Sequence, residues 1–250
     1  MRICRFERAG REAWGVVEGD QVRALSDAPW AGGLPEGPAI PLAGLALLAP
    51  VAPTKVLCVG RNYAAHAKEL GNETPKEPLL FLKPSTAVIG PGAAIRIPEV
   101  SAEVHHEAEL GVVLGRPLTR ASPQEARAAV FGFTCLNDVT ARDIQRAEKQ
   151  FTRAKGFDTF CPVGPVVETA LDVRDVSVIC RVNGDVRQQG HTRDMTWDPF
   201  ELLSYMSWVM TLLPGDVVAT GTPEGVGPIR QGDVVEVEIS GLGILSNPVT

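Results

Sequence analysis

Two carboxylates, Glu107 and Glu109, stand two residues apart at the head of an apolar, β-branched run that continues to Leu114. Residues i and i+2 of a strand project from the same face, so these two side chains would lie side by side. Adjacent anions repel each other unless a cation or a layer of solvent separates them. Both a hard divalent metal and a solvated strand edge account for this pattern.

A third acidic residue, Asp138, follows an apolar stretch and precedes a segment with helical character. An aspartate in this position can simply cap the helix. Combined with Glu107 and Glu109, it would instead complete a set of three oxygen ligands that leaves positions open for water or substrate, as Mg²⁺ and Mn²⁺ sites do. The sequence therefore offers a candidate site for Mg²⁺, with Mn²⁺ as the other metal that fits.

A histidine and a glutamate, His66 and Glu69, stand three residues apart in a segment rich in helix-forming residues, residues 61–70. On a helix they would share one face. A glutamate that accepts one imidazole N–H leaves the other ring nitrogen available as a base near neutral pH. The alternative is an exposed pair on a surface helix. His105 and His106 are weaker candidates, because an all-oxygen Mg²⁺ site has no need of imidazole.

The composition is that of a folded globular protein, with 44% hydrophobic and 22% charged residues in a chain of 250. Its formal net charge of −6 and pI near 5.3 give no general attraction to phosphate backbones or anionic lipids. We therefore expect neither nucleic acid nor a membrane surface as a partner. A small anionic substrate would need local positive charge or a metal.

The five cysteines are spread along the chain without a C-x-x-C pair, which is typical of buried thiols in a reducing compartment. The first residues alternate apolar and charged side chains, unlike a signal peptide, and no stretch approaches the ~20 apolar residues of a membrane-spanning helix. The expected location is the cytoplasm.

A connector rich in Pro and Gly separates a small N-terminal β module, residues 1–51, from a main domain, residues 52–250. Strands outnumber helices in the main domain and do not alternate with them regularly, which predicts a β-rich α+β fold instead of a doubly wound or TIM-barrel sheet. The expected elements are strands at 55–60, 79–82, 109–114, 130–136, 176–182, 217–220 and 233–239, and helices at 61–70, 122–130, 140–149 and 198–212.

Seven short motifs occur in the order found in the fumarylacetoacetate hydrolase family, and the chain resembles that family over residues 51–250. They are V-G-R-N-Y-x-x-H at 59–66, F-L-K-P-S at 81–85, H-H-E-x-E-L at 105–110, N-D-V-T-A-R-D at 137–143, K-G-F-D-T at 155–159, T-G-T-P-x-G-V-G at 220–227 and S-N-P-V at 246–249. The resemblance implies a mixed β-roll core, a homodimer, and a divalent metal, usually Mg²⁺, held by Glu107, Glu109 and Asp138.

The resemblance also assigns expected roles to other side chains. His66, oriented by Glu69, would activate water, and Lys155 would favour negative charge on a substrate oxygen. Arg142 matches a position near the substrate or is a purely structural ion-pair partner. The residues expected to bind substrate are Arg61, Asn62, Lys83, Gln145 and Thr222.

The implied function is a Mg²⁺-dependent enzyme acting on small 2-oxo or 2-hydroxy-dienoic (di)carboxylates through a metal-bound enolate. The specific form most resembled is the 2-hydroxyhepta-2,4-diene-1,7-dioate isomerase/decarboxylase of aromatic catabolism. An acylpyruvate (fumarylpyruvate-type) C–C hydrolase and an oxaloacetate decarboxylase are the alternatives. A catalytically silent acid-binding module would be expected to lack a metal ligand or Lys155, and none is missing.

Overall fold

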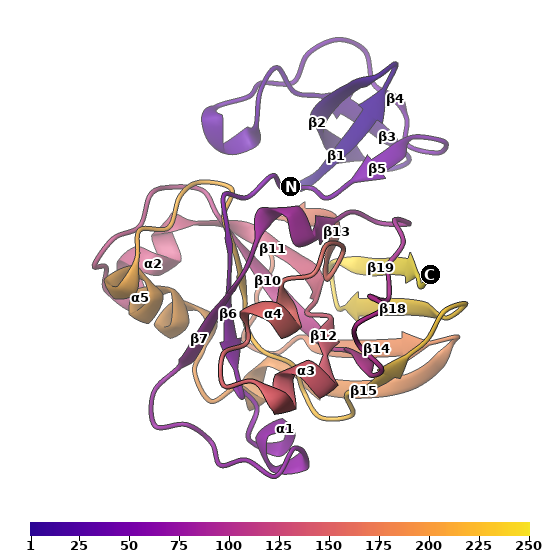
Figure 1. Cartoon of the computed structure of the whole chain (residues 1–250). Coiled ribbons are helices and arrows are strands. Elements are labelled where there is room, and N and C mark those ends of the chain that lie inside the picture. Colours follow the sequence, from indigo (N-terminus) through magenta and orange to yellow (C-terminus); the bar gives the residue numbers. More distant parts are fainter.

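The computed structural model describes all 250 residues and is rich in strands (Figure 1). The strands are β1 Arg2–Arg8, β2 Arg11–Glu18, β3 Gln21–Ala24, β4 Ile40–Pro41, β5 Ala46–Leu48, β6 Val56–Gly60, β7 Leu79–Lys83, β8 Val88–Ile89, β9 Val104–His106, β10 Ala108–Leu114, β11 Val130–Asn137, β12 Thr140–Ala141, β13 Cys161–Glu168, β14 Ser177–Val182, β15 Asp185–His191, β16 Val217–Ala219, β17 Gly227–Ile229, β18 Val234–Ile239 and β19 Gly243–Pro248. The α-helices are α1 Ala64–Glu69, α2 Pro123–Ala129, α3 Arg142–Ala147, α4 Thr152–Lys155 and α5 Pro199–Val209, and short 3₁₀ turns lie at Pro29–Ala31, Ser85–Ala87 and Thr192–Asp194.

One large mixed sheet runs through the molecule in the order β4-β3-β2-β1-β13-β11-β10-β16-β6-β7, with β5 and β8 attached to β1 and β13. Most neighbours are antiparallel, but β16 runs parallel to β6, and β8 runs parallel to β13. Strand β10 lies well inside this sheet and is buried at every position. Its near-continuous apolar sequence fits a strand that is covered on both faces.

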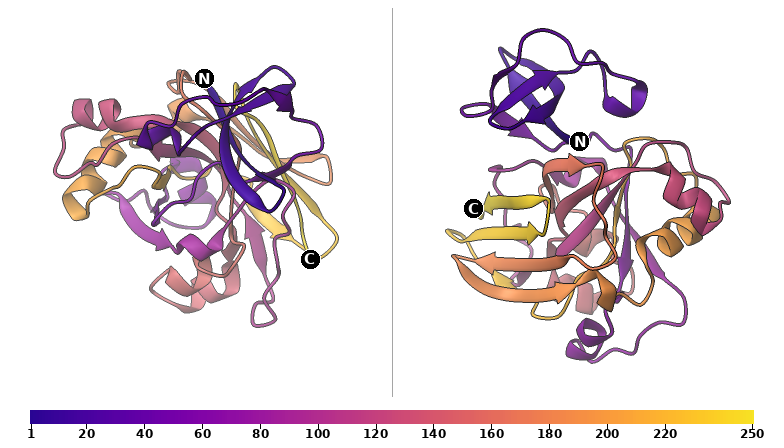
Figure 2. Two further views of the ribbon diagram at one scale, coloured as in Figure 1. Left: turned by 90° about the horizontal axis from the view of Figure 1, so that it is seen from above. Right: turned by 180° about the vertical axis from the view of Figure 1, so that it is seen from behind.

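A second layer is the four-stranded sheet β15-β14-β18-β19, whose orange and yellow strands lie beside the main sheet (Figure 2). Strands β14 and β18 alternate buried and less buried residues, so one face of this sheet points inward. That face joins β10, β11 and the inner side of α5 in the largest hydrophobic core of the molecule. Strand β10, which carries Glu109, is therefore held between two layers.

The N-terminal residues form a compact group of strands, β1 to β5, at the top of Figure 1. A small apolar cluster around Cys4, Phe6 and Val22 fills its interior. Strand β1 also pairs with β13 through Arg2 and Ile3, which makes the module continuous with the main sheet.

The strand-rich α+β class predicted from the sequence is confirmed. Ser122 and Asp198 form the capping boxes that start α2 and α5. All four expected helices are shorter than predicted; in particular, α3 begins only at Arg142, and α5 ends at Val209. Asp138 therefore caps no helix.

Strand β13 is absent from the sequence-based prediction because Pro162, Gly164 and Pro165 interrupt its pattern. Prolines usually demote a segment to an edge or a bulge. Here the register between β11 and β13 shifts between Phe133 and Cys135, and this irregularity accommodates them inside the sheet.

All five cysteines are buried free thiols, as expected. No helix of the structure has the length and apolar character needed to span a membrane.

The start of the parallel pair β6 and β16 is fixed by a single buried carboxylate, Asp216. It accepts hydrogen bonds from the backbone N–H groups of Thr54, Lys55 and Leu213, from the Thr54 hydroxyl, and from the Lys55 ammonium at 2.5 Å. Burial opposes ionisation of Asp216, but these donors outweigh it and hold its pKa below the usual range.

We predict that Asp216→Asn lowers the free energy of unfolding by about 2 kcal/mol at pH 7, because charge-assisted hydrogen bonds are lost inside the protein. A depressed carboxyl pKa stabilises the fold above the unfolded-state pKa of about 4 and loses that effect as the pH falls through the native value. The difference between variant and wild type should therefore shrink below about pH 4. Urea denaturation across this range measures it, with exposed Asp185→Asn as the control; a difference independent of pH would contradict the assignment.

Candidate functional site

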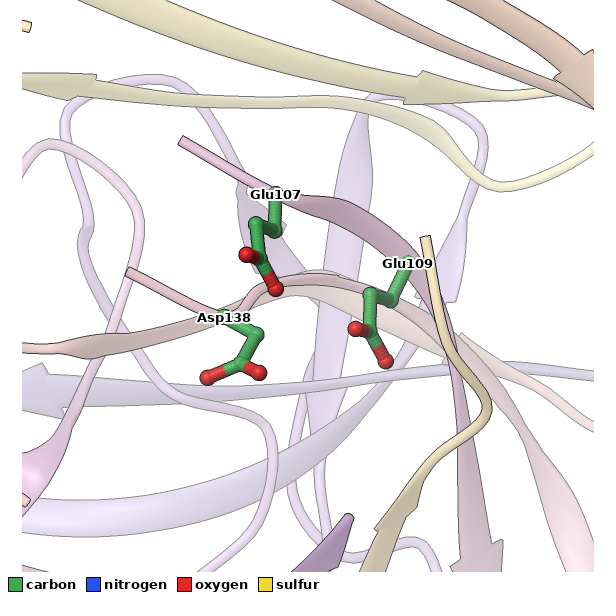
Figure 3. Close-up of side chains that lie close together, drawn as sticks. All are labelled: Glu107, Glu109 and Asp138. Carbon is green, nitrogen blue, oxygen red and sulfur yellow. The ribbon is translucent and has the colours of Figure 1, made fainter. Parts of the chain in front are cut away.

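Three carboxylates converge where two neighbouring strands leave the large sheet (Figure 3). Glu107 occupies the single residue between β9, which belongs to a small sheet with β12 and β17, and β10 of the large sheet. Asp138 directly follows β11, and the β10–β11 register places Ala108 opposite Asn137. Hydrogen bonds from Asp138 N–H to the Glu107 carbonyl and from Glu107 N–H to Asn137 Oδ1 fix this crossing.

Glu107 and Glu109 point to the same side, as the i, i+2 spacing predicts, and Asp138 faces them (Figure 3). One oxygen from each of the three carboxylates lies within 4.8 Å of the others. All three residues are buried, with Glu107 4%, Glu109 1% and Asp138 0% exposed. A solvated strand edge is therefore excluded.

Three buried cations surround the carboxylates. Lys155 Nζ bridges Glu107 Oε2, at 2.8 Å, and Asp138 Oδ2. Lys83 Nζ contacts Asp138 Oδ1 at 2.5 Å, and the Arg142 guanidinium pairs with Glu107 Oε1. Each of these two carboxylates thus has a cation on both of its oxygens.

Glu109 has no cationic partner and accepts one hydrogen bond, from Gly221 N–H at 2.7 Å. Burial, together with the charges of Asp138 and Glu107, raises its pKa well above the usual range. For Glu107 burial also opposes ionisation, but Lys155 and Arg142 hold the pKa below its usual range. The same two carboxylates, Glu107 and Asp138, raise the pKa of Lys155 against the effect of its burial.

This set of side chains fits a hard divalent cation. Three carboxyl groups supply only oxygen donors, at a mutual spacing that one ion can span, and Glu109 has no cationic partner within the chain. His105 and His106 do not belong to the cluster: His105 lies between Glu103 and Arg142, and His106 bonds Gln188. Burial lowers the pKa of His106 to about 4, so its imidazole is neutral.

A cavity of about 610 Å³ opens onto the carboxylates. It brings together most of the side chains that sequence reasoning assigned to the site. Those lining it are Arg61, His66, Glu107, Glu109, Asp138, Arg142, Gln145, Lys155 and Thr222. Their proximity is established by the structure, whereas their chemical roles stay predictions.

His66 and Glu69 lie on α1, as their spacing predicts. His66 Nδ1 faces Glu69 Oε2 at 3.3 Å, and His66 is 5% exposed. The second Glu69 oxygen accepts a hydrogen bond from Gly225 N–H at 3.0 Å, which ties the helix to the loop after β16. Glu69 itself is not among the residues that line the cavity.

Two of the residues expected to bind substrate, Lys83 and Asn62, form buried hydrogen bonds within the protein. The side chain of Lys83 is fully buried and bonds Asp138 and the carbonyl of Val139, outside the cavity lining. Asn62 is also buried; its amide bonds the backbones of Trp197 and Thr220. Neither side chain lines the cavity, and their roles in substrate binding stay predictions.

Thr222 reaches the cavity with its hydroxyl already engaged. Its Oγ1 donates to the Ala108 carbonyl at 2.8 Å and accepts from Gln188 Nε2 at 2.7 Å. One lone pair remains, so Thr222 can only accept a hydrogen bond from a substrate hydroxyl.

Sequence reasoning missed several residues of the cavity wall, namely Leu79, Phe81, Arg146, Lys149 and Phe151. Arg61 and Lys149 have no hydrogen-bond or ion-pair partner within the chain, which leaves two free cations on the wall. Lys149 sits after a helical segment in a run of charged residues, and nothing in its spacing distinguishes it from an ordinary solvated lysine.

Comparison with known proteins gives two matches to family models. Residues 55–250 match the model described as fumarylacetoacetate (FAA) hydrolase C-terminal, and residues 1–50 match the one described as Rv2993c-like, N-terminal. The chain belongs to the fumarylacetoacetate hydrolase family.

Relatives within this family carry names of different reactions. The structure of 5-carboxymethyl-2-hydroxymuconate delta-isomerase from Mycobacterium smegmatis is 45% identical, with a TM-score of 0.94 over 100% of this chain and 99% of that one. For 2-hydroxyhepta-2,4-diene-1,7-dioate isomerase from Mycobacterium marinum the values are 43% and 0.93 over 100% and 98%. Oxaloacetate tautomerase FAHD2A from Bos taurus is 44% identical over 85% of this chain and 72% of its own length.

Members of the fumarylacetoacetate hydrolase family are enzymes that commonly use a divalent metal, and the buried triad is the set of residues that would hold it here. The positions of Glu107, Glu109 and Asp138 in this chain agree with the ligand set that the resemblance implies.

We predict that Mg²⁺ binding releases protons and weakens as the pH falls, because burial and the neighbouring carboxylates raise the pKa of Glu109 and favour its protonated form over the form that binds a cation. Isothermal titration calorimetry in two buffers of different ionisation enthalpy measures the proton release. Glu109→Gln should abolish binding, and exposed Glu73→Gln should leave it unchanged. Equal Mg²⁺ affinity in wild type and Glu109→Gln would contradict the ligand assignment.

Proposed function

We propose that this family member is a Mg²⁺-dependent isomerase of small 2-oxo or 2-hydroxy-dienoic dicarboxylates, of the 2-hydroxyhepta-2,4-diene-1,7-dioate type. Mn²⁺ is the other ion that suits the site. One observation carries the proposal: His66, Lys155 and the three carboxylates all line the same cavity. The names of two similar isomerases and of an oxaloacetate tautomerase agree with it.

Charge on the cavity wall supports a dianionic substrate. A bound divalent ion supplies Lewis-acid polarisation of the substrate carboxylate and its adjacent oxygen. Lys155 stabilises negative charge that develops on that oxygen. Arg61 and Lys149, which have no partner in the chain, can receive a second, distal carboxylate, while Gln145 offers an amide nearby.

We assign proton transfer to His66. Its Nδ1 faces Glu69, so Nε2 is the nitrogen available to take the proton of the substrate's enol hydroxyl and deliver it to a carbon of the diene. Thr222 accepts a hydrogen bond from the enol hydroxyl with its remaining lone pair. Isomerisation, which moves one proton and needs no water, uses all of these groups. Decarboxylation uses the charge stabilisation but needs no base.

A second candidate is C–C bond hydrolysis of an acylpyruvate of the fumarylpyruvate type. The His66–Glu69 pair favours it, because a histidine oriented by a carboxylate can also activate water. Decarboxylation of oxaloacetate is a third reaction that the same charges serve. A silent acid-binding module is disfavoured, since no candidate ligand or base is missing.

A substrate panel tests the function. With Mg²⁺, the purified protein should isomerise 2-hydroxyhepta-2,4-diene-1,7-dioate faster than it turns over acetylpyruvate or oxaloacetate, measured as the change in enol absorbance. His66→Ala should reduce isomerisation by about 10²- to 10⁴-fold, the usual contribution of a general base, and spare decarboxylation of oxaloacetate.

The control is His191→Ala, a surface histidine paired with Asp175. Absence of turnover with all three compounds, while Mg²⁺ binding is demonstrated by calorimetry, would overturn the enzymatic proposal. Equal loss of isomerisation and decarboxylation in His66→Ala would refute its role as the base.

We also propose a cytoplasmic homodimer, joined beside the active-site cavity. Strand β7 forms one end of the large sheet, and Leu82 on it is 39% exposed. An apolar groove runs from this strand to the end of α5, where Trp208 is 66% and Val209 57% exposed. An open strand edge with exposed apolar side chains is a surface that a second copy can cover.

We predict a dimer by size-exclusion chromatography with light scattering. Trp208→Glu should convert it to a monomer, because a charge cannot be buried unpaired in an apolar interface. Val186→Glu, at an exposed valine of β15, is the matched control. A monomeric wild-type protein at micromolar concentration would contradict the proposal.

A further inference from the structure

Behind the carboxylates lies a buried glutamine that the proposed chemistry does not use. Gln188 is in β15, the edge strand of the four-stranded sheet, and is 1% exposed, whereas Arg187 and Gln189 on either side are exposed. A carboxamide buried on an edge strand needs partners for two donors and an acceptor. Those partners show what the side chain does.

Every hydrogen-bonding group of the Gln188 amide is used. Its Oε1 accepts from Ala108 N–H at 3.0 Å and from His106 Nδ1 at 2.9 Å. Its Nε2 donates to Thr222 Oγ1 at 2.7 Å and to the Pro223 carbonyl at 2.8 Å. Since a carbonyl oxygen can only accept, the proton of the neutral His106 ring must sit on Nδ1.

These bonds hold the residue between two metal-ligand candidates. Ala108 separates Glu107 from Glu109, and Gln188 bonds its N–H while Thr222, itself held by Gln188, bonds its carbonyl. Both polar groups of this peptide segment are therefore fixed by one network. A rotation of the Ala108 backbone would turn the two carboxylates away from their common side.

The same network reaches Glu109 by a second route. Gly221 N–H donates the hydrogen bond that Glu109 accepts, and Gly221 directly precedes Thr222. The turn is tight: Gly221 has φ of 96°, and a Cβ there would come within 2.7 Å of the Asn62 side chain. Holding Thr222 and Pro223 thus also holds the donor that orients Glu109.

We propose that Gln188 is a positioning residue of the metal site, which sets the relative orientation of Glu107 and Glu109 without touching metal or substrate. The inference rests on the proposed metal site and is independent of which reaction the enzyme catalyses. Residues that orient metal ligands typically contribute about 10- to 100-fold to metal affinity. An affinity change of that size is the signature that separates positioning from a purely structural role.

The test uses Mn²⁺ as the probe, with its dissociation constant from calorimetry and the shape of its electron paramagnetic resonance spectrum. Gln188→Leu removes all four hydrogen bonds and should weaken Mn²⁺ binding by about 10- to 100-fold and change the spectrum of the bound ion. Gln189→Leu, one position along the same strand, should alter neither.

A double-mutant cycle with Thr222→Val tests the network. If Gln188 acts partly through Thr222, the double variant should bind Mn²⁺ more tightly than the product of the two single effects predicts. Gln188→Asn, which keeps the amide but shortens its reach, replaces Gln188→Leu if the latter does not fold, with the same weakening expected.

Unchanged Mn²⁺ affinity and spectrum in a folded Gln188 variant, with only the melting temperature lowered, would overturn the positioning role. Failure of the wild-type protein to bind Mn²⁺ would instead overturn the metal site itself. The two failures are distinguished by the wild-type titration.

Discussion

The structure depends on the burial of three like charges within one small volume. Glu107, Glu109 and Asp138 would repel one another strongly in a medium of low dielectric constant. Lys155, Lys83 and Arg142 neutralise the first and third, and Glu109 is left as the carboxylate without a cation. A divalent ion would supply the cationic contact that Glu109 lacks, so the chemistry of the donor set and the electrostatics of the protein lead to the same site.

The layered arrangement of the sheets positions these three carboxylates. Glu107 stands where the chain passes from a small sheet into the large one, and the change of sheet frees its side chain to face Asp138 across the end of β11. The apolar core between the two larger sheets excludes water from behind the carboxylates. Gln188 connects the second layer to the site. It belongs to the four-stranded sheet, which is remote in sequence, and its side chain bonds the backbone of Ala108 between Glu107 and Glu109.

The parts of the site that could be predicted from sequence are those encoded by local spacing. Once the element is known, local spacing determines which side chains share a face. Residues 107 and 109 share one face of an extended segment, and residues 66 and 69 share one face of a helix. The contacts of Gln188, Asn62 and Lys83 are hydrogen bonds across 55 to 158 positions of sequence, which no local pattern specifies. The same holds for the fold: the capped helices were predictable, whereas β13, with its prolines, is a strand only because its neighbours make it one.

The loop after β16 is hydrogen-bonded both to helix α1, which carries His66, and to Glu109. Helix α1 has six residues, too few to be stable by itself, so the direction of His66 depends on what the helix is attached to. Glu69 provides that attachment by bonding His66 with one oxygen and Gly225 N–H with the other. The same loop bonds Glu109 through Gly221 and Gln188 through Thr222. The proposed base and Glu109 of the candidate metal site are therefore both hydrogen-bonded to one short segment, so a shift of residues 221–225 would disturb both.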